Sequence, residues 1–134
     1  MEKITFPATI DNLRSMLAFI DEGAKALGFD EQKIHQIMVA SEEALVNVIN
    51  YAYPEKPGEV EVVRELRENK SLMIEIKDSG IAFDPLSLPE PNIHAPMERR
   101  RPGGLGIYMI RKIMDEVRYK REGQYNILTM VKNQ

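Results

Sequence analysis

The sequence has 134 residues and contains neither cysteine nor tryptophan. The absence of cysteine excludes disulfides, thiolate zinc sites and cysteine nucleophiles, and it fits a reducing compartment. No apolar stretch approaches the roughly 20 residues of a membrane-spanning helix, and the N-terminus lacks a signal-like segment, so we expect a cytoplasmic protein without a membrane partner. Positive charge is not in excess: 18 Lys and Arg against 21 Asp and Glu give a net charge of −3, which argues against direct nucleic-acid binding.

The composition that is present, with 43% hydrophobic and 29% charged residues, is that of a globular protein with a buried core. We expect a single domain over residues 1–134, because this length is close to the commonest domain size. Between 78 and 102 the hydrophobic periodicity disappears, and five of the eight prolines lie within 85–102. An irregular segment of this length inside a compact domain is typical of a functional or disordered loop.

Periodicity elsewhere predicts helices and strands in the order β-α-α-β-β-loop-α-β-β. The strands are predicted over 2–6, 59–68, 71–77 and on both sides of Gly123, and the helices from Thr9 or Asp11 to Gly28, over about 31–53, and onward from Gly103. Their apolar stripes are Ile10, Leu13, Leu17, Ile20, Ala24 and Leu27, then Ile34, Ile37, Met38, Leu45, Val48, Ile49 and Ala52, then Leu105, Met109, Ile110, Ile113, Met114 and Val117. This order predicts an α+β two-layer sandwich, with a largely antiparallel sheet and helices on one face.

The second predicted helix has an unusual polar face. Gln36, Glu43, Asn47 and Asn50 fall within about 60° of one another, opposite the predicted apolar stripe. One interpretation is a capped, solvated helix face. The other is a hard-metal site, in which the Asn47 carboxamide oxygen binds Mg²⁺ and the Glu43 carboxylate, one turn earlier, accepts a proton. Glu42 is rotated about 140° from Asn47 and is therefore not the candidate acid.

Two further motifs follow. Asp78-Ser79-Gly80 comes directly after a predicted strand. One interpretation is an ordinary turn, for which Asp and Gly are common residues. The other is a binding site in which the carboxylate accepts a hydrogen bond from an exocyclic amine and Gly80 lets a flat ring approach the backbone. Glycines 103, 104 and 106 open the third helix, either as packing or hinge residues or as backbone N–H donors to a polyphosphate. At least two of the three arginines in the run 99–101 are expected to form a solvated charge run, and one could reach a phosphate; Arg101 is the candidate for that contact. Neither the P-loop nor the GxGxxG spacing is present.

Together, these three motifs resemble the Bergerat-fold ATPases, which include DNA gyrase, Hsp90 chaperones and histidine kinases. The helix with Glu43 and Asn47 is similar to the N-box, Asp78-Ser79-Gly80 to the first glycine box, and Gly103-Gly104-Leu105-Gly106 to the second. Within this superfamily, the sequence resembles most closely the small anti-sigma-factor serine kinases. The segments that carry this resemblance are Ser41–Asn47, Tyr51–Tyr53, Phe83–Pro85 and the glycine box with Ile107. Tyr51 stands where the kinases of bacilli usually have histidine.

The resemblance implies ATP and Mg²⁺ as cofactors, with a lid over about 86–102. Glu43 is implied as the catalytic base and Asn47 as the metal ligand. The residues expected at the nucleotide are Asn47, Asn50, Asp78, Gly80, Phe83, Arg101, Gly103, Gly104, Leu105, Gly106 and Ile107. The implied partners are an anti-anti-sigma (STAS) protein that carries the acceptor serine and a sigma factor or other effector, and the resemblance also admits a homodimer.

Two functions follow from the resemblance. The first is an ATP-dependent protein-serine kinase of a partner-switching system, which phosphorylates the STAS partner and sequesters the effector. The alternative is a non-catalytic module that binds ATP and sequesters its partner without phosphotransfer. The catalytic domain of a histidine kinase is set aside, because 134 residues leave no place for a dimerisation helix with an acceptor histidine.

Overall fold

The computed structural model describes residues 1–83 and 104–134, and for 104–107 it describes the backbone alone. The predicted lid over 86–102, with Arg101 and Gly103, lies outside the described residues. The elements are β1 (Glu2–Pro7), a 3₁₀ turn η1 (Ile10–Asn12), α1 (Leu13–Ala26), α2 (Glu31–Tyr51), β2 (Glu59–Leu66), β3 (Ser71–Asp78), α3 (Gly104–Ile113), β4 (Glu116–Glu122) and β5 (Tyr125–Asn133).

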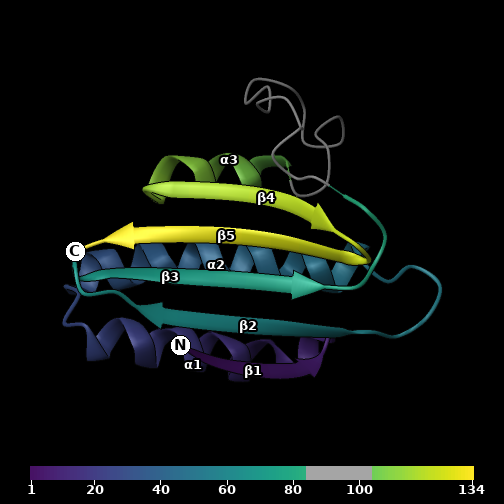
Figure 1. Ribbon diagram of the computed structural model, residues 1–134, viewed down its shortest axis with the longest axis horizontal. Helices are drawn as coiled ribbons and strands as arrows, with labels where there is room; N and C mark the ends of the chain where they lie inside the picture. The colour runs from purple at the N-terminus through teal and green to yellow at the C-terminus, as the bar shows by residue number, and fades with distance from the viewer. Residues whose placement is uncertain (84–103) are drawn as a thin grey trace.

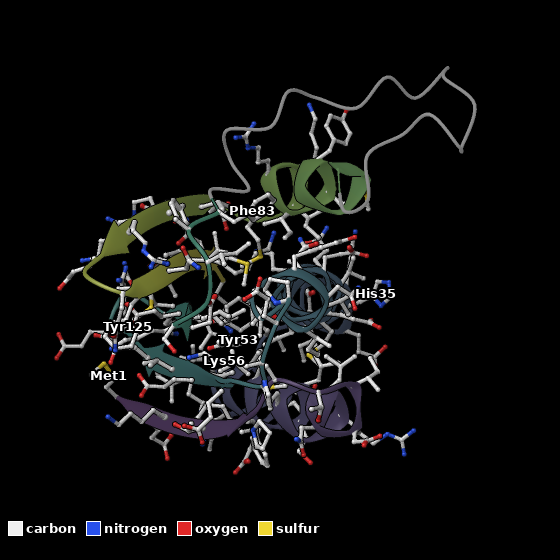
Figure 2. All side chains as sticks on the ribbon, turned by 90° about the vertical axis from the view of Figure 1, so that its right-hand side faces the viewer. Met1, His35, Tyr53, Lys56, Phe83 and Tyr125 are labelled. Atoms are coloured by element: carbon white, nitrogen blue, oxygen red, sulfur yellow. The ribbon has the colours of Figure 1, made fainter. Side chains whose placement is uncertain are left out.

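The described residues form one five-stranded sheet in the order β1-β2-β3-β5-β4, and each neighbouring pair is antiparallel. Helix α2 lies behind the middle of the sheet, with α1 near β1 and β2 and with α3 near β4 (Figure 1). Seen end-on, the helices occupy one side and the sheet the other (Figure 2). The predicted α+β two-layer sandwich is therefore confirmed. Among the described helices, none has the length and apolar character needed to cross a membrane.

The core lies between these layers and follows from the two periodicities of the sequence. Strand residues at every second position point toward the helices, and helix residues at steps of three and four point back. The fully or almost fully buried members are Met16, Ile20, Ile37, Leu45, Val60, Val62, Leu72, Ile74, Ile76, Ile110 and Met130. A smaller cluster of Val63, Met73 and Val131 lies on the opposite face of the sheet.

Several details of the predicted stripes are wrong, among them Val117, which was assigned to the third helix but belongs to β4. Ile10 is 61% exposed and Met109 39% exposed, whereas Met16, which was not in the first stripe, is completely buried. Ile10 falls in the 3₁₀ turn η1, whose tighter winding shifts it out of the phase of the α-helix that begins at Leu13. The hydrophobic count also missed the small inward residues of α2, namely Ala40, Ser41 and Ala44.

The predicted ends of the first two helices are partly confirmed. Asp30 caps α2 through a hydrogen bond in which the Lys33 backbone N–H donates to Asp30 Oδ1 (2.8 Å). Gly28 follows α1 with a positive φ of 80°, as a C-terminal glycine should. At the start of α1, however, neither Thr9 nor Asp11 accepts a capping bond; instead Asn12 Nδ2 donates to Pro7 O and to Thr9 Oγ1.

Three charged side chains of the sheet are buried, namely Arg64, Asp78 and Lys132, and Arg64 connects the edge of the sheet to a helix. Arg64, on the helix-facing side of β2, is 8% exposed and binds Glu2 of β1 through Nε (3.0 Å) and through Nη2 (2.9 Å). Its Nη1 donates to Phe19 O (2.6 Å), and the guanidinium lies 4.1 Å from the centroid of the Phe19 ring. Arg64 thereby connects the edge strand β1 to α1.

Candidate functional site

A cavity opens at the end of the sandwich where α2, β3 and β5 terminate or begin, the end that faces the viewer in Figure 2. The atom-free space there, including the open mouth that solvent fills, is about 490 Å³, whereas the volume open to the centre of a water-sized sphere is about 50 Å³. The lining is mostly apolar and aromatic, and Asn47, Asp78 and Asn126 are its three carboxylate or carboxamide side chains. The other lining residues are Ala44, Val48, Tyr51, Ala52, Ile76, Ile81, Phe83, Tyr119 and Leu128.

Asp78 ends β3 and is the one carboxylate among these lining residues; it is 6% exposed. Its Oδ1 accepts two hydrogen bonds, from the Gly80 backbone N–H (2.9 Å) and from Asn126 Nδ2 (2.9 Å). No donor from the described residues reaches Oδ2. Because Asp78 lines the cavity, Oδ2 is the acceptor that the protein leaves for a ligand.

The turn after Asp78 is fixed against the C-terminal end of α2. A Cβ atom on Gly80 would lie 2.1 Å from Ala52 O, so only glycine permits this approach. The Ile81 backbone N–H then donates to the same carbonyl (2.9 Å). We predicted that Gly80 lets a ligand ring approach; in the structure, the atom that its missing side chain admits is the carbonyl of α2.

Tyr53 holds the same turn from the other side. Its hydroxyl donates to Glu59 O (2.5 Å) and accepts from the Ser79 backbone N–H (2.9 Å). The ring packs where a Cβ on Gly58 would be, 2.0 Å from Cε1, so Gly58 makes room for it. Figure 2 shows Tyr53 between α2 and the sheet.

Asn126 of β5 is a functional candidate that sequence reasoning missed. It is 7% exposed, and its Nδ2 donates to Asp78 Oδ1 and to Ile81 O (2.7 Å). Its Oδ1 accepts from the Tyr119 hydroxyl (2.6 Å) and from the Phe83 backbone N–H (3.4 Å). The sequence signal is slight: polar Asn126 occupies a helix-facing position of a strand whose other such positions include apolar Leu128 and Met130.

Arg121, at the end of β4, also holds the turn after Asp78, because its Nη1 donates to Gly80 O (2.8 Å). A neighbouring pair on that strand lies outside the cavity lining. There the hydrogen bond and charge of Lys120 lower the pKa of Glu122, and the same bond raises the pKa of Lys120. Both groups are fully exposed, so this pair does not tune the site.

Of the three candidate site residues on α2, only Asn47 lines the cavity. Asn47 lines the cavity, and its Nδ2 is buried without a hydrogen-bond partner in the described residues. Glu43 is half-buried and Asn50 exposed, and neither lines the cavity. The predicted polar face is not opposite the packed face: Asn47 borders it, because the inward stripe is centred on the small residues that the hydrophobic count omitted.

The glycine box opens α3 as predicted, with Gly104 as its first residue and Gly106 within its first turn. The side chains of Leu105 and Ile107 lie outside the described residues. The other end of α3 is fixed, because buried Lys132 donates from Nζ to Ile113 O, a carbonyl at the helix C-terminus.

Comparison with known proteins places this geometry in a family. The sequence profile of the histidine kinase-like ATPase domain matches residues 6–132. The chain belongs to this family. Serine-protein kinase RsbW of Bacillus thuringiensis is 32% identical over 109 residues, which cover 78% of this chain and 68% of that protein. The RsbW of Bacillus cereus matches to the same extent.

Solved structures of other proteins share the fold. The RsbU and RsbW domains of Rv1364c from Mycobacterium tuberculosis superpose with a TM-score of 0.65 at 17% identity, over 99% of this chain and 32% of that chain. The chain thus spans about a third of that structure. The histidine kinase domain of Erythrobacter litoralis EL346 gives a TM-score of 0.56 at 16% identity, over 90% and 60% of the two chains. The anti-sigma kinase family predicted from the sequence is confirmed, and the comparisons support the predicted enzyme class, a protein kinase.

Proposed function

We propose that this protein is an ATP-dependent protein-serine kinase of a partner-switching system. The observation that carries the proposal is that Asn47 of α2 and Asp78 of β3, from two separate motifs, line one open, mostly apolar cavity. Asp78 Oδ2 would accept a hydrogen bond from the exocyclic amine of adenine, and the apolar residues that line the cavity would cover the ring. The backbone N–H groups at the start of α3 would face the phosphates.

The residues present fit a magnesium ion. Asn47 has no hydrogen-bond partner in the described residues, and since its Nδ2 is buried, Oδ1 is the atom left for a ligand. A carboxamide oxygen is a suitable donor for a hard cation. When bound with ATP, Mg²⁺ neutralises charge on the transferred phosphoryl group.

Glu43 would act as the general base. It lies one turn before Asn47 on α2, is half-buried, and forms no ion pair or hydrogen bond with the described residues, so its carboxylate is free to accept the proton of a serine hydroxyl. The chain's remaining contribution is to position the nucleotide. The anchored turn at Asp78 serves that purpose, because Ala52, Tyr53 and Asn126 hold it from three sides.

The proposed acceptor is a serine on an anti-anti-sigma (STAS) protein, and the proposed effector is a sigma factor or another regulator that is held when the STAS partner is phosphorylated. The naming of the relatives as serine-protein kinases supports a serine acceptor. Their similarity over most of the chain supports the same partner class, in the cytoplasm.

The test is to incubate the protein with labelled ATP, Mg²⁺ and the STAS protein encoded beside it. We expect label on serine. Glu43→Gln, which keeps the size of the side chain and removes the base, should reduce the labelling rate at least a hundredfold while nucleotide affinity stays within about twofold. Glu42→Gln is the matched control, because Glu42 is the exposed neighbour on the same helix, and it should label normally.

The outcomes separate the two functions. Tight nucleotide and partner binding without labelling in the wild-type protein would favour the non-catalytic module. Normal labelling by Glu43→Gln would show that the base assignment is wrong while leaving the kinase intact.

A further inference from the structure

The cavity contains a hydrogen-bonded chain that begins at a tyrosine on the edge strand. The Tyr119 hydroxyl of β4 donates to Asn126 Oδ1 of β5 (2.6 Å), and Asn126 Nδ2 donates to Asp78 Oδ1 of β3 (2.9 Å). The chain thus crosses three adjacent strands, all on the helix-facing side of the sheet.

The neighbours of Asn126 determine how its amide is oriented. A carboxylate and a carbonyl accept from Nδ2, so both N–H groups are used inside the protein. On the other side, the Tyr119 hydroxyl supplies the short bond to Oδ1, since the Phe83 N–H lies at 3.4 Å. Loss of the hydroxyl would leave a buried amide oxygen with one long bond.

This arrangement has a consequence for Asp78. Because Oδ1 is occupied by Asn126 and Gly80, the carboxylate plane is fixed, and only Oδ2 is available toward the cavity. Asn126 has no free N–H group, so it cannot donate to a ligand itself. It holds the carboxylate and the turn that follows it.

We infer that Tyr119 is a positioning residue for base recognition, which acts through Asn126 to aim Asp78 Oδ2 at the exocyclic amine of the nucleotide. This inference rests on the proposed nucleotide binding. It assigns to Tyr119 a contribution that depends on the ligand: the hydroxyl should matter for a base with an amine and not for the same base without one.

The test is calorimetric titration of wild type and Tyr119→Phe with Mg²⁺ and two ligands, ADP and purine riboside 5′-diphosphate, which lacks only the amine. Phenylalanine keeps the ring that lines the cavity. We expect a three- to tenfold loss of affinity for ADP, roughly the value of one hydrogen bond, and less than a twofold change for the purine analogue.

Tyr125→Phe is the matched control. Tyr125 belongs to β5 and lies on the sheet side away from the helices, with Lys77 Nζ 4.2 Å from its ring centroid (Figure 2). The same substitution there should leave both affinities unchanged.

A double-mutant cycle tests the route through Asn126. In an Asn126→Ala background, Tyr119→Phe should cause no further loss of ADP affinity. The inference is overturned if Tyr119→Phe weakens both ligands equally, if it weakens neither, or if its effect persists in that background. If the wild-type protein binds neither ligand, the proposed function fails instead.

Discussion

At the scale of single residues, the Asn47 side chain should cost stability in the protein without ligand. Its buried Nδ2 has no partner in the described residues, and an unsatisfied buried donor costs about 1–3 kcal/mol. Alanine is also a better helix former than asparagine. We therefore expect Asn47→Ala to raise the free energy of unfolding in urea by about 1–2 kcal/mol without nucleotide, while weakening Mg²⁺-dependent nucleotide binding.

Asn50→Ala provides the comparison for that experiment. Asn50 is exposed on the same helix, so its replacement should yield only the helix-propensity gain, about 0.5 kcal/mol. If Asn47→Ala raised the free energy of unfolding no more than Asn50→Ala does, the view that the Asn47 amide is held at a cost to stability would be wrong.

At the scale of elements, the contact between α2 and the turn after β3 depends on the absence of one Cβ. An alanine at position 80 would bring its Cβ to 2.1 Å from Ala52 O, and a backbone carbonyl cannot move aside cheaply. We expect Gly80→Ala to lower the free energy of unfolding by about 2–3 kcal/mol, a cost typical of overpacking, and to weaken nucleotide binding, because Asp78 is two residues away.

Gly123→Ala separates a local clash from backbone strain. Gly123 has a positive φ of 61°, and a Cβ there would meet nothing within 4 Å. Its replacement should cost about 1 kcal/mol through left-handed strain and leave nucleotide affinity unchanged. Equal effects of the two variants in urea unfolding and in titration would refute a specific role for the contact between α2 and the turn.

The attachment of β1 to α1 offers a second prediction at this scale. The partners of Arg64 include Glu2 and Glu22, whose side chains are 58% and 74% exposed and remain solvated when the arginine is lost. Most of the contribution of Arg64 should then come from its stem and its contact with Phe19. We expect Arg64→Met to change the free energy of unfolding by less than about 1 kcal/mol and Arg64→Ala to lower it by about 2–3 kcal/mol. Similar losses in both variants would instead assign the stabilisation to the charge.

The same elements show how far the sequence could be interpreted. Strong alternation and glycine or proline boundaries predicted the strands and helices to within a few residues. The inward face of α2 was misplaced, because Ala40, Ser41 and Ala44 weigh little in a hydrophobic count although their small size lets the helix lie close to the sheet. Asn126 and Tyr119 gave no usable signal, since their partners are distant in sequence and are brought together only by strand pairing.

At the scale of the whole molecule, the proposed nucleotide site has two parts. One is the group of hydrogen-bonded side chains on the sheet, and the other is the first turn of α3. Asp78, Asn126 and Tyr119 are fixed by bonds among β3, β5 and β4, while the far end of α3 is fixed by Lys132. A nucleotide that contacts both Asp78 and the first turn of α3 would connect elements that lie on opposite layers. Binding should therefore stabilise the domain as a unit rather than one loop.

That expectation can be measured by thermal unfolding. A ligand that binds only the folded state at one hundred times its Kd adds about 2.7 kcal/mol of stability. For a domain of this size, this corresponds to a rise in Tm of roughly 10 °C with ADP and Mg²⁺. Removal of Mg²⁺ with EDTA should abolish most of the rise in the wild-type protein. In Asn47→Ala, the rise should be small before EDTA is added and change little afterwards, because the side chain that links the ion to α2 is gone. A rise that is equally large in both proteins and insensitive to EDTA would mean that the nucleotide binds without the ion at Asn47.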